Sequence, residues 1–182
     1  MNRREALRAT TLVVGGMLLT SNGLVLGCVR EREQHVDRVL SADDQALVEA
    51  IADTLLPTTQ SSPGARAAGA GAAINLLLTD CYEADAQVRV VNGLKEFRRT
   101  CAARCGRAFA TLPAAERESL LREIDAEAQR IGADHWFGLV RELAVRTYFT
   151  SEIGMTRARR WMLVPGRWVG CVSLAPGQPA WA

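Results

Sequence analysis

The sequence predicts an all-α single domain of about five helices that continues into a long irregular C-terminal arm. Two observations carry this prediction. Apolar residues recur three or four positions apart between residues 41 and 154, which is the spacing of amphipathic helices, and no strand-like alternation extends beyond a few positions. Glycine and proline then become frequent among apolar residues. We therefore expect the arm to begin at about residue 155.

The composition is that of an ordinary globular domain. The chain has 182 residues, of which 48% are hydrophobic and 23% are charged, and these values exclude collagen-like, disordered and polytopic membrane proteins. Its 22 Lys and Arg residues nearly balance its 20 Asp and Glu residues, for a net charge of +2. A nucleic-acid-binding domain carries a clearly basic stripe, so we expect no nucleic-acid partner.

Residues 1–27 have the pattern of an export signal. Arg3, Arg4 and Arg8 precede an uncharged, mostly apolar stretch that ends at Gly27. Polar residues interrupt this stretch, and it is shorter than the roughly 20 apolar residues of a membrane span, so a cleaved leader is favoured over a retained anchor. The pair Arg3-Arg4 resembles a twin-arginine signal, which addresses folded proteins for export. An ordinary secretory signal that begins with two arginines is the alternative.

The leader ends at a candidate lipidation site. Val25-Leu26-Gly27-Cys28 resembles a lipoprotein processing box, and a lipid on Cys28 would hold the protein at a membrane surface. Cleavage at another position, which would leave Cys28 without lipid, is the alternative. We expect residues 28–40 to form a polar tether and residues 41–182 to form the helical domain with its arm. The expected location is periplasmic and membrane-associated.

The first three helices follow from caps, breakers and apolar spacing. Ser41 with two following acidic residues marks the start of the first helix, and Pro57 ends it. Residues 58–71 form a loop, residues 82–85 form a turn between the second and third helices, and Gly106 ends the third. The expected inward residues are Leu47, Val48, Ile51 and Leu55; then Ile74, Leu77, Leu78 and Cys81; then Val88, Val91, Leu94, Phe97, Cys101 and Cys105.

The fourth and fifth helices are separated by Gly132. Pro113 stands at the first turn of the fourth helix. A further helical turn is expected from Thr156 to Trp161. The expected inward residues are Leu120, Leu121, Ile124, Ala128 and Ile131, then Trp136, Val140, Leu143, Ala144 and Thr147, with Phe137 and Tyr148 at the flanks of the last face.

Few residues are suited to catalysis. His35 falls in the tether, so His135 is the one imidazole in the predicted helical domain, and it lacks the Glu three positions earlier that a di-iron site needs. The sequence contains no phosphate-binding glycine loop, no Gly-x-Ser-x-Gly elbow and no haem attachment motif. We therefore expect no active site, metal or cofactor in this chain. A cysteine- or metal-dependent enzyme is an alternative that requires a bound metal or a reactive thiol.

Four cysteines beyond Cys28 are disulfide candidates, because thiols of exported proteins tend to be oxidised. They are Cys81, Cys101, Cys105 and Cys171, and they allow three pairings. Cys101 and Cys105 share a helical face, and either is expected to be able to meet Cys81 on the neighbouring helix. One helix cysteine and Cys171 then remain, and Cys171 would close the arm onto the domain or bridge to another chain. A metal site at Cys101 and Cys105 is a weaker alternative.

Three of the four tryptophans fall in the arm: Trp161, Trp168 and Trp181. An irregular segment has no core of its own, so its aromatic side chains pack either on the helices or on a partner, where tryptophan is enriched at energetically important positions. Both alternatives stay open from composition.

Four stretches together make the chain resemble the gluconate 2-dehydrogenase subunit 3 family. They are Arg3-Arg4, Ala52–Pro57, Tyr148–Gly154 and Val164–Cys171. The family usually has a Tyr-x-Pro-x-Pro-Gly run where this chain reads Trp161-Met162-Leu163-Val164-Pro165-Gly166. Because of this departure, the local path of the arm, and the catalytic subunit that the arm fits, can differ from those of other family members.

The resemblance implies a non-catalytic subunit whose partner is a large FAD-dependent dehydrogenase of the glucose-methanol-choline type, often joined by a multihaem cytochrome c. The expected roles are twin-arginine export escort, assembly factor and membrane tether, with FAD bound by the partner. A free-standing periplasmic helical lipoprotein with a binding or scaffolding role is the rival hypothesis. The residues expected to dock the partner are Phe149, Thr150, Ser151, Glu152, Gly154, Pro165, Gly166, Trp168, Gly170, Cys171 and Trp181.

Overall fold

The computed structural model describes residues 38–164, 166, 169–173 and 175–181. The predictions for the leader, Arg3, Arg4, Cys28 and His35 lie outside the described residues, as do those for Pro165 and Trp168. The described residues belong to one compact unit that begins at Arg38.

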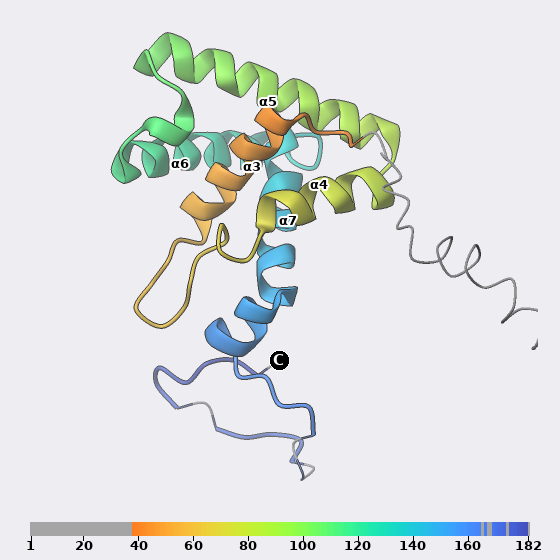
Figure 1. Ribbon diagram of the computed structural model, residues 1–182, viewed down its shortest axis with the longest axis vertical. Helices are drawn as coiled ribbons and strands as arrows, with labels where there is room; N and C mark the ends of the chain where they lie inside the picture. The colour runs from red at the N-terminus through yellow and green to blue at the C-terminus, as the bar shows by residue number, and fades with distance from the viewer. Residues whose placement is uncertain (1–37, 165, 167–168, 174, 182) are drawn as a thin grey trace, which may run out of the picture. The chain divides into compact units, whose positions relative to one another are not determined.

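The predicted all-α fold class is confirmed, since the described residues form five α-helices and no extended strand (Figure 1). An isolated bridge between Arg160 and Trp181 is the one β-type pairing among them. The elements are α3 (Ala42–Leu55), α4 (Ala70–Cys81), α5 (Ala84–Cys105), the short 3-10 helix η1 (Phe109–Thr111), α6 (Ala114–Ile131), α7 (Trp136–Thr150) and the π-helical turn η2 (Gly154–Ala158).

Helix α7 lies at the centre of the helical domain. It packs against α3, α4, α5 and α6, and Figure 1 shows it passing behind α3 and α4 and beneath α5. Because neighbours surround it, its buried arc is wider than a single amphipathic stripe. Phe137 and Tyr148, expected at the flanks, are therefore buried, with exposed fractions of 0% and 4%.

Several helix boundaries follow the predicted caps. The Ser41 side chain accepts a hydrogen bond from the Asp44 N–H at 3.2 Å, and α5 ends at Gly106 with a positive φ of 64°. Two boundaries differ from the prediction. α4 already begins at Ala70, and α5 begins at Ala84 inside the expected turn.

Three residues expected in the core are exposed, and one of them is Cys81, the last residue of α4. Val88 is 57% exposed and Ile131 is 51% exposed. Val88 lies two positions from both Ala86 and Val90 on the buried face of α5, and two positions rotate a helix by about 200° to its opposite side. Ile131 is the last residue of α6, where the final turn extends past the core.

The folded domain includes two residues assigned to the tether. Leu40 is buried, and its N–H donates to the Asn75 Oδ1 at 3.0 Å, while the Asn75 Nδ2 donates back to the Leu40 carbonyl at 3.1 Å. The Val39 N–H donates to the Thr79 Oγ1 at 3.2 Å. Side chains of α4 therefore fix the chain immediately before α3.

Candidate partner-docking site

The C-terminal half of α7 holds the loop between α3 and α4. The Tyr148 hydroxyl donates to the Pro63 carbonyl at 2.8 Å and lies 2.6 Å from the Ser62 Oγ. The Asp53 carboxylate accepts from the Arg66 N–H at 3.3 Å on the other side of the loop. The loop is therefore hydrogen-bonded to α7 through Tyr148 and to α3 through Asp53. These bonds hold the loop against the end of α7 from which the arm departs.

Ser151 and Gly154 shape the exit from α7. The Ser151 hydroxyl donates to the Tyr148 carbonyl at 2.6 Å and accepts from the Gly154 N–H at 3.0 Å. A Cβ at position 154 would lie 1.9 Å from the Tyr148 carbonyl oxygen, so glycine is required for the chain to pass this close. Both residues were expected to dock a partner, and the structure gives them this internal role.

The other candidates near this exit differ in exposure. Phe149 is half-buried, packs edge-on against Tyr148 with 5.0 Å between ring centroids, and has the Arg159 guanidinium 6.0 Å from its own ring. Thr150 and Glu152 are exposed. The π-helical turn η2 follows, in place of the helical turn expected from Thr156 to Trp161. Thr150, Glu152 and the free edge of Phe149 are therefore the accessible part of this segment.

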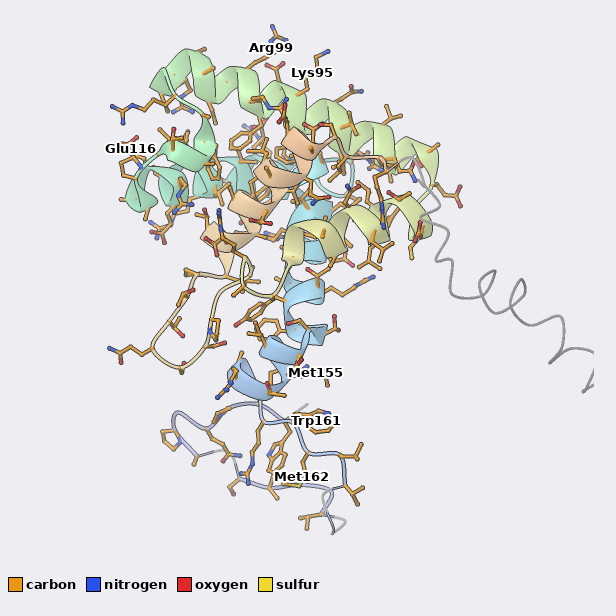
Figure 2. All side chains as sticks on the ribbon, in the orientation of Figure 1. Lys95, Arg99, Glu116, Met155, Trp161 and Met162 are labelled. Atoms are coloured by element: carbon orange, nitrogen blue, oxygen red, sulfur yellow. The ribbon has the colours of Figure 1, made fainter. Side chains whose placement is uncertain are left out.

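The arm after η2 presents apolar side chains to solvent. Leu163 and Val164 are 76% and 75% exposed, and Trp161 is 48% exposed. In Figure 2, Trp161 and Met162 lie beyond the end of α7, away from the helical core. No described residue after Ala158 joins the hydrophobic core. Composition left open whether the arm packs on its own helices or on a partner. In the described residues, the apolar side chains of the arm do not pack on the helices.

The two ends of the arm contact each other. The Arg160 N–H donates to the Ala180 carbonyl at 2.8 Å, and the Arg160 guanidinium lies 4.3 Å from the centre of the Trp181 ring. Such a cation–π contact at an exposed site contributes about 0.5–1 kcal/mol. Gly170 and Cys171, between these ends, are exposed. The arm is therefore a closed loop with outward-facing apolar side chains.

Comparison with known proteins identifies the family. The family model described as gluconate 2-dehydrogenase subunit 3 matches residues 42–166, which is more than half of the chain. No curated protein and no solved structure matches. The chain belongs to the gluconate 2-dehydrogenase subunit 3 family. As a subunit 3 protein it is related to a component of a dehydrogenase complex, and the region shared with the family runs from the start of α3 to Gly166 in the arm.

Gly170, Cys171 and Trp181 lie beyond the part of this subunit 3 chain that the family model matches. Leu163 and Val164 lie inside it and were missed as docking candidates. The signal that reveals them is the run of four consecutive apolar residues Trp161–Val164, because such a run outside a core is exceptional unless it is functional. Arg160 was missed because its contact with Trp181 joins positions far apart in the sequence.

The structure does not bring Cys81 close to Cys101 or Cys105, which the sequence analysis allowed as alternatives. Cys81 ends α4 just before α5 begins, whereas Cys101 lies near the other end of α5. At 1.5 Å per residue, Cys101 is about 26 Å along the helix from Ala84, and a disulfide needs Cα atoms about 4.4–6.8 Å apart. Cys81, Cys101, Cys105 and Cys171 are all free thiols in this structure.

In this subunit 3 chain, Cys101 and His135, which were considered for catalysis, are a buried thiol and a helix cap. Burial of Cys101, followed by its proximity to Cys105, raises the pKa of the Cys101 thiol to about 11, so this thiol stays protonated near neutral pH. His135 caps α7 by accepting the Phe137 N–H on its Nδ1 at 3.3 Å. The described residues include no cluster of metal-ligating side chains.

Within the same part of the chain, no helix is long and apolar enough to cross a membrane.

Proposed function

We propose that this protein is the non-catalytic small subunit of an exported FAD-dependent sugar or sugar-acid dehydrogenase complex, and that its arm docks on the large catalytic subunit. The observation that carries the proposal is the closed arm of a subunit 3 domain, with Leu163 and Val164 about three-quarters exposed. Contiguous exposed apolar side chains mark interaction sites in soluble proteins. The docking residues in this proposal are the exposed arm residues together with Phe149, Thr150 and Glu152.

In this proposal, the leader makes the small subunit an export escort. A flavoprotein folds around FAD before it crosses the membrane, so a bound partner carrying Arg3 and Arg4 would take the folded complex through the twin-arginine route. The FAD and the substrate pocket then belong to the large subunit, and a multihaem cytochrome c is the expected electron acceptor. The complex would act in the periplasm.

Cys28 supplies the membrane attachment in this proposal. A single lipid chain binds a membrane only marginally, whereas several chains on one cysteine anchor a protein stably. The processed and lipidated Cys28 would hold the complex at the membrane surface, where the electron acceptor is expected. The small subunit would thus combine escort, assembly and tethering without chemistry of its own.

The test is export of the complex. The chain is co-expressed with a large FAD-dependent dehydrogenase subunit, and dye-linked dehydrogenase activity is measured in the periplasmic and cytoplasmic fractions. Replacing both Arg3 and Arg4 by Lys is expected to leave most of the activity in the cytoplasm, because the export machinery reads the arginine pair. Arg8→Lys is the matched control and is expected to export normally.

Equal export of the double variant would overturn the escort role. The partner would then carry its own signal or would not bind this chain. In the second case the chain would also be stable and monodisperse alone, which is the behaviour of a free-standing helical lipoprotein.

A further inference from the structure

A groove of about 360 Å³ separates α5 from α6 at the N-terminal end of α7. Its floor is apolar and consists of Phe97 and Cys101 from α5, Leu120 and Ile124 from α6, and Trp136 from α7. The two long helices make few contacts with each other here, since each packs mainly on α7 or α3. The groove is therefore an opening between two helices above a shared apolar floor.

Trp136 forms one end of this groove because position 93 is glycine. A Cβ at Gly93 would lie 2.1 Å from the Trp136 Cγ, so the indole rests directly on the backbone of α5. Its ring centroid is 5.9 Å from that of Phe97. Trp136 is only half-buried, so part of this aromatic surface faces the groove.

The shape of the groove favours a helical segment as its occupant. Its α5 wall runs from Gly93 to Arg104, which is about three turns or 16 Å of helix. A volume of about 360 Å³ over that length is too small to enclose an α-helix 10–12 Å in diameter. A bound helix would therefore lie across the opening and insert side chains from one face, as in helix-in-groove recognition.

The rim of the groove is acidic. Glu96, Glu123 and Glu127 line it, against one guanidinium, that of Arg104. Glu123 is bonded to Arg104 at 2.8 Å, and Glu96 is bonded to Arg99, which lies outside the lining, at 3.0 Å. Glu127 has no ion pair among the described residues, so the lining itself carries three carboxylates against one guanidinium. The rim is complementary to a cationic partner.

We propose that this groove binds a basic amphipathic helix of a partner protein. A row of apolar side chains at i, i+3 or i+4, and i+7 would fill the floor, and flanking lysines or arginines would face Glu96, Glu123 and Glu127. The arm leaves the opposite end of α7, whose length is about 21 Å. The groove is therefore a second docking site, independent of the arm.

The test measures binding of a fluorescently labelled 14-residue helical peptide of leucine and lysine by anisotropy, using the full chain. A peptide with glutamate in place of every lysine is the probe control. The basic peptide is expected to bind, with an affinity that falls as salt rises, and the acidic peptide is not. Glu123→Lys combined with Glu127→Lys is expected to weaken binding about tenfold or more, which corresponds to 1.4 kcal/mol or more.

Glu118→Lys is the matched protein control, because Glu118 lies on α6 outside the groove and pairs with Arg122. Circular dichroism establishes that each variant is folded. Equal binding of the two peptides, unchanged binding by the double variant, or an equal loss in the Glu118→Lys control would each overturn the proposal. In the last case the peptide would be responding to general surface charge.

Discussion

Cys101 illustrates how position governs the chemistry of a residue. It is 1% exposed on the floor of the groove, and desolvation disfavours the thiolate, so its pKa rises to about 11. Cys81 and Cys171 are exposed in the same structure. The sequence treats these thiols as equivalent disulfide candidates, whereas burial makes one of them an inert core residue.

We therefore expect Cys101 to be the slowest of the described cysteines to react with iodoacetamide at pH 8. Its raised pKa lowers the fraction of thiolate, and its low exposure limits access of the reagent to the sulfur. Mass spectrometry of peptides after timed alkylation measures the order of reaction, with Cys81 and Cys171 as internal references. Alkylation of Cys101 as fast as that of Cys81 would contradict the burial seen here.

The same shift has a consequence for stability. The folded state holds the Cys101 proton more tightly than the unfolded chain does, so this contribution is complete below pH 9.0, the ordinary pKa of the thiol, and is lost as pH rises toward about 11. The free energy of unfolding, measured by denaturant titration at pH values below 9.0 and near 11, is therefore expected to be lower at the higher pH.

At the scale of elements, the helices and the arm are stabilised differently. Each helix buries one face against α7 or its neighbours, whereas the arm is held by the Arg160–Trp181 contact and local turns. Changing exposed arm side chains should therefore leave the helical domain intact. This separation allows docking to be tested without unfolding the protein.

Leu163→Asp combined with Val164→Asp is expected to change the free energy of unfolding by about 0.5 kcal/mol or less, because both side chains are exposed. The same change should abolish co-elution with the large subunit, since it places charge in the apolar docking surface. Size-exclusion chromatography of the co-expressed proteins measures the second effect. Val88→Asp, at an exposed apolar position on α5, is the control and should co-elute.

At the scale of the whole molecule, Cys171 is a candidate for a disulfide to the catalytic chain. It is exposed in the arm, and under the proposed export of this chain its thiols would tend to be oxidised. In the sequence analysis, Cys171 remained over only because Cys81 was paired with Cys101 or Cys105. The length of α5 separates Cys81 from these two residues, so that argument no longer supports a role for Cys171. Exposure in the proposed docking segment is the support that remains.

We expect non-reducing electrophoresis of the assembled complex to show a species that contains both chains and disappears on reduction. Cys171→Ser should remove this species, and Cys81→Ser should not. A complex that yields only monomer-sized bands without reductant would exclude the intermolecular disulfide.

The sequence by itself determined the fold class and most helix boundaries, because caps such as Ser41 and Gly106 and apolar spacing of three or four act within a few residues. The resemblance carried by Arg3-Arg4, Ala52–Pro57, Tyr148–Gly154 and Val164–Cys171 also indicated the family, which the match over residues 42–166 confirms. Their individual roles were not determined, since the bonds of Tyr148 to Ser62 and Pro63 join distant segments.

Only the tertiary structure decided which apolar residues face solvent. Phe137 became core because burial depends on how many neighbours surround a helix, which periodicity does not encode. Val88 became surface because the packed face of α5 passes through Ala86 and Val90 on the opposite side of the helix. The groove beside Trp136 and the exposed arm arise in the same way, from the packing of separate elements. Local patterns fix helices, whereas long-range packing fixes the surfaces that helices leave open.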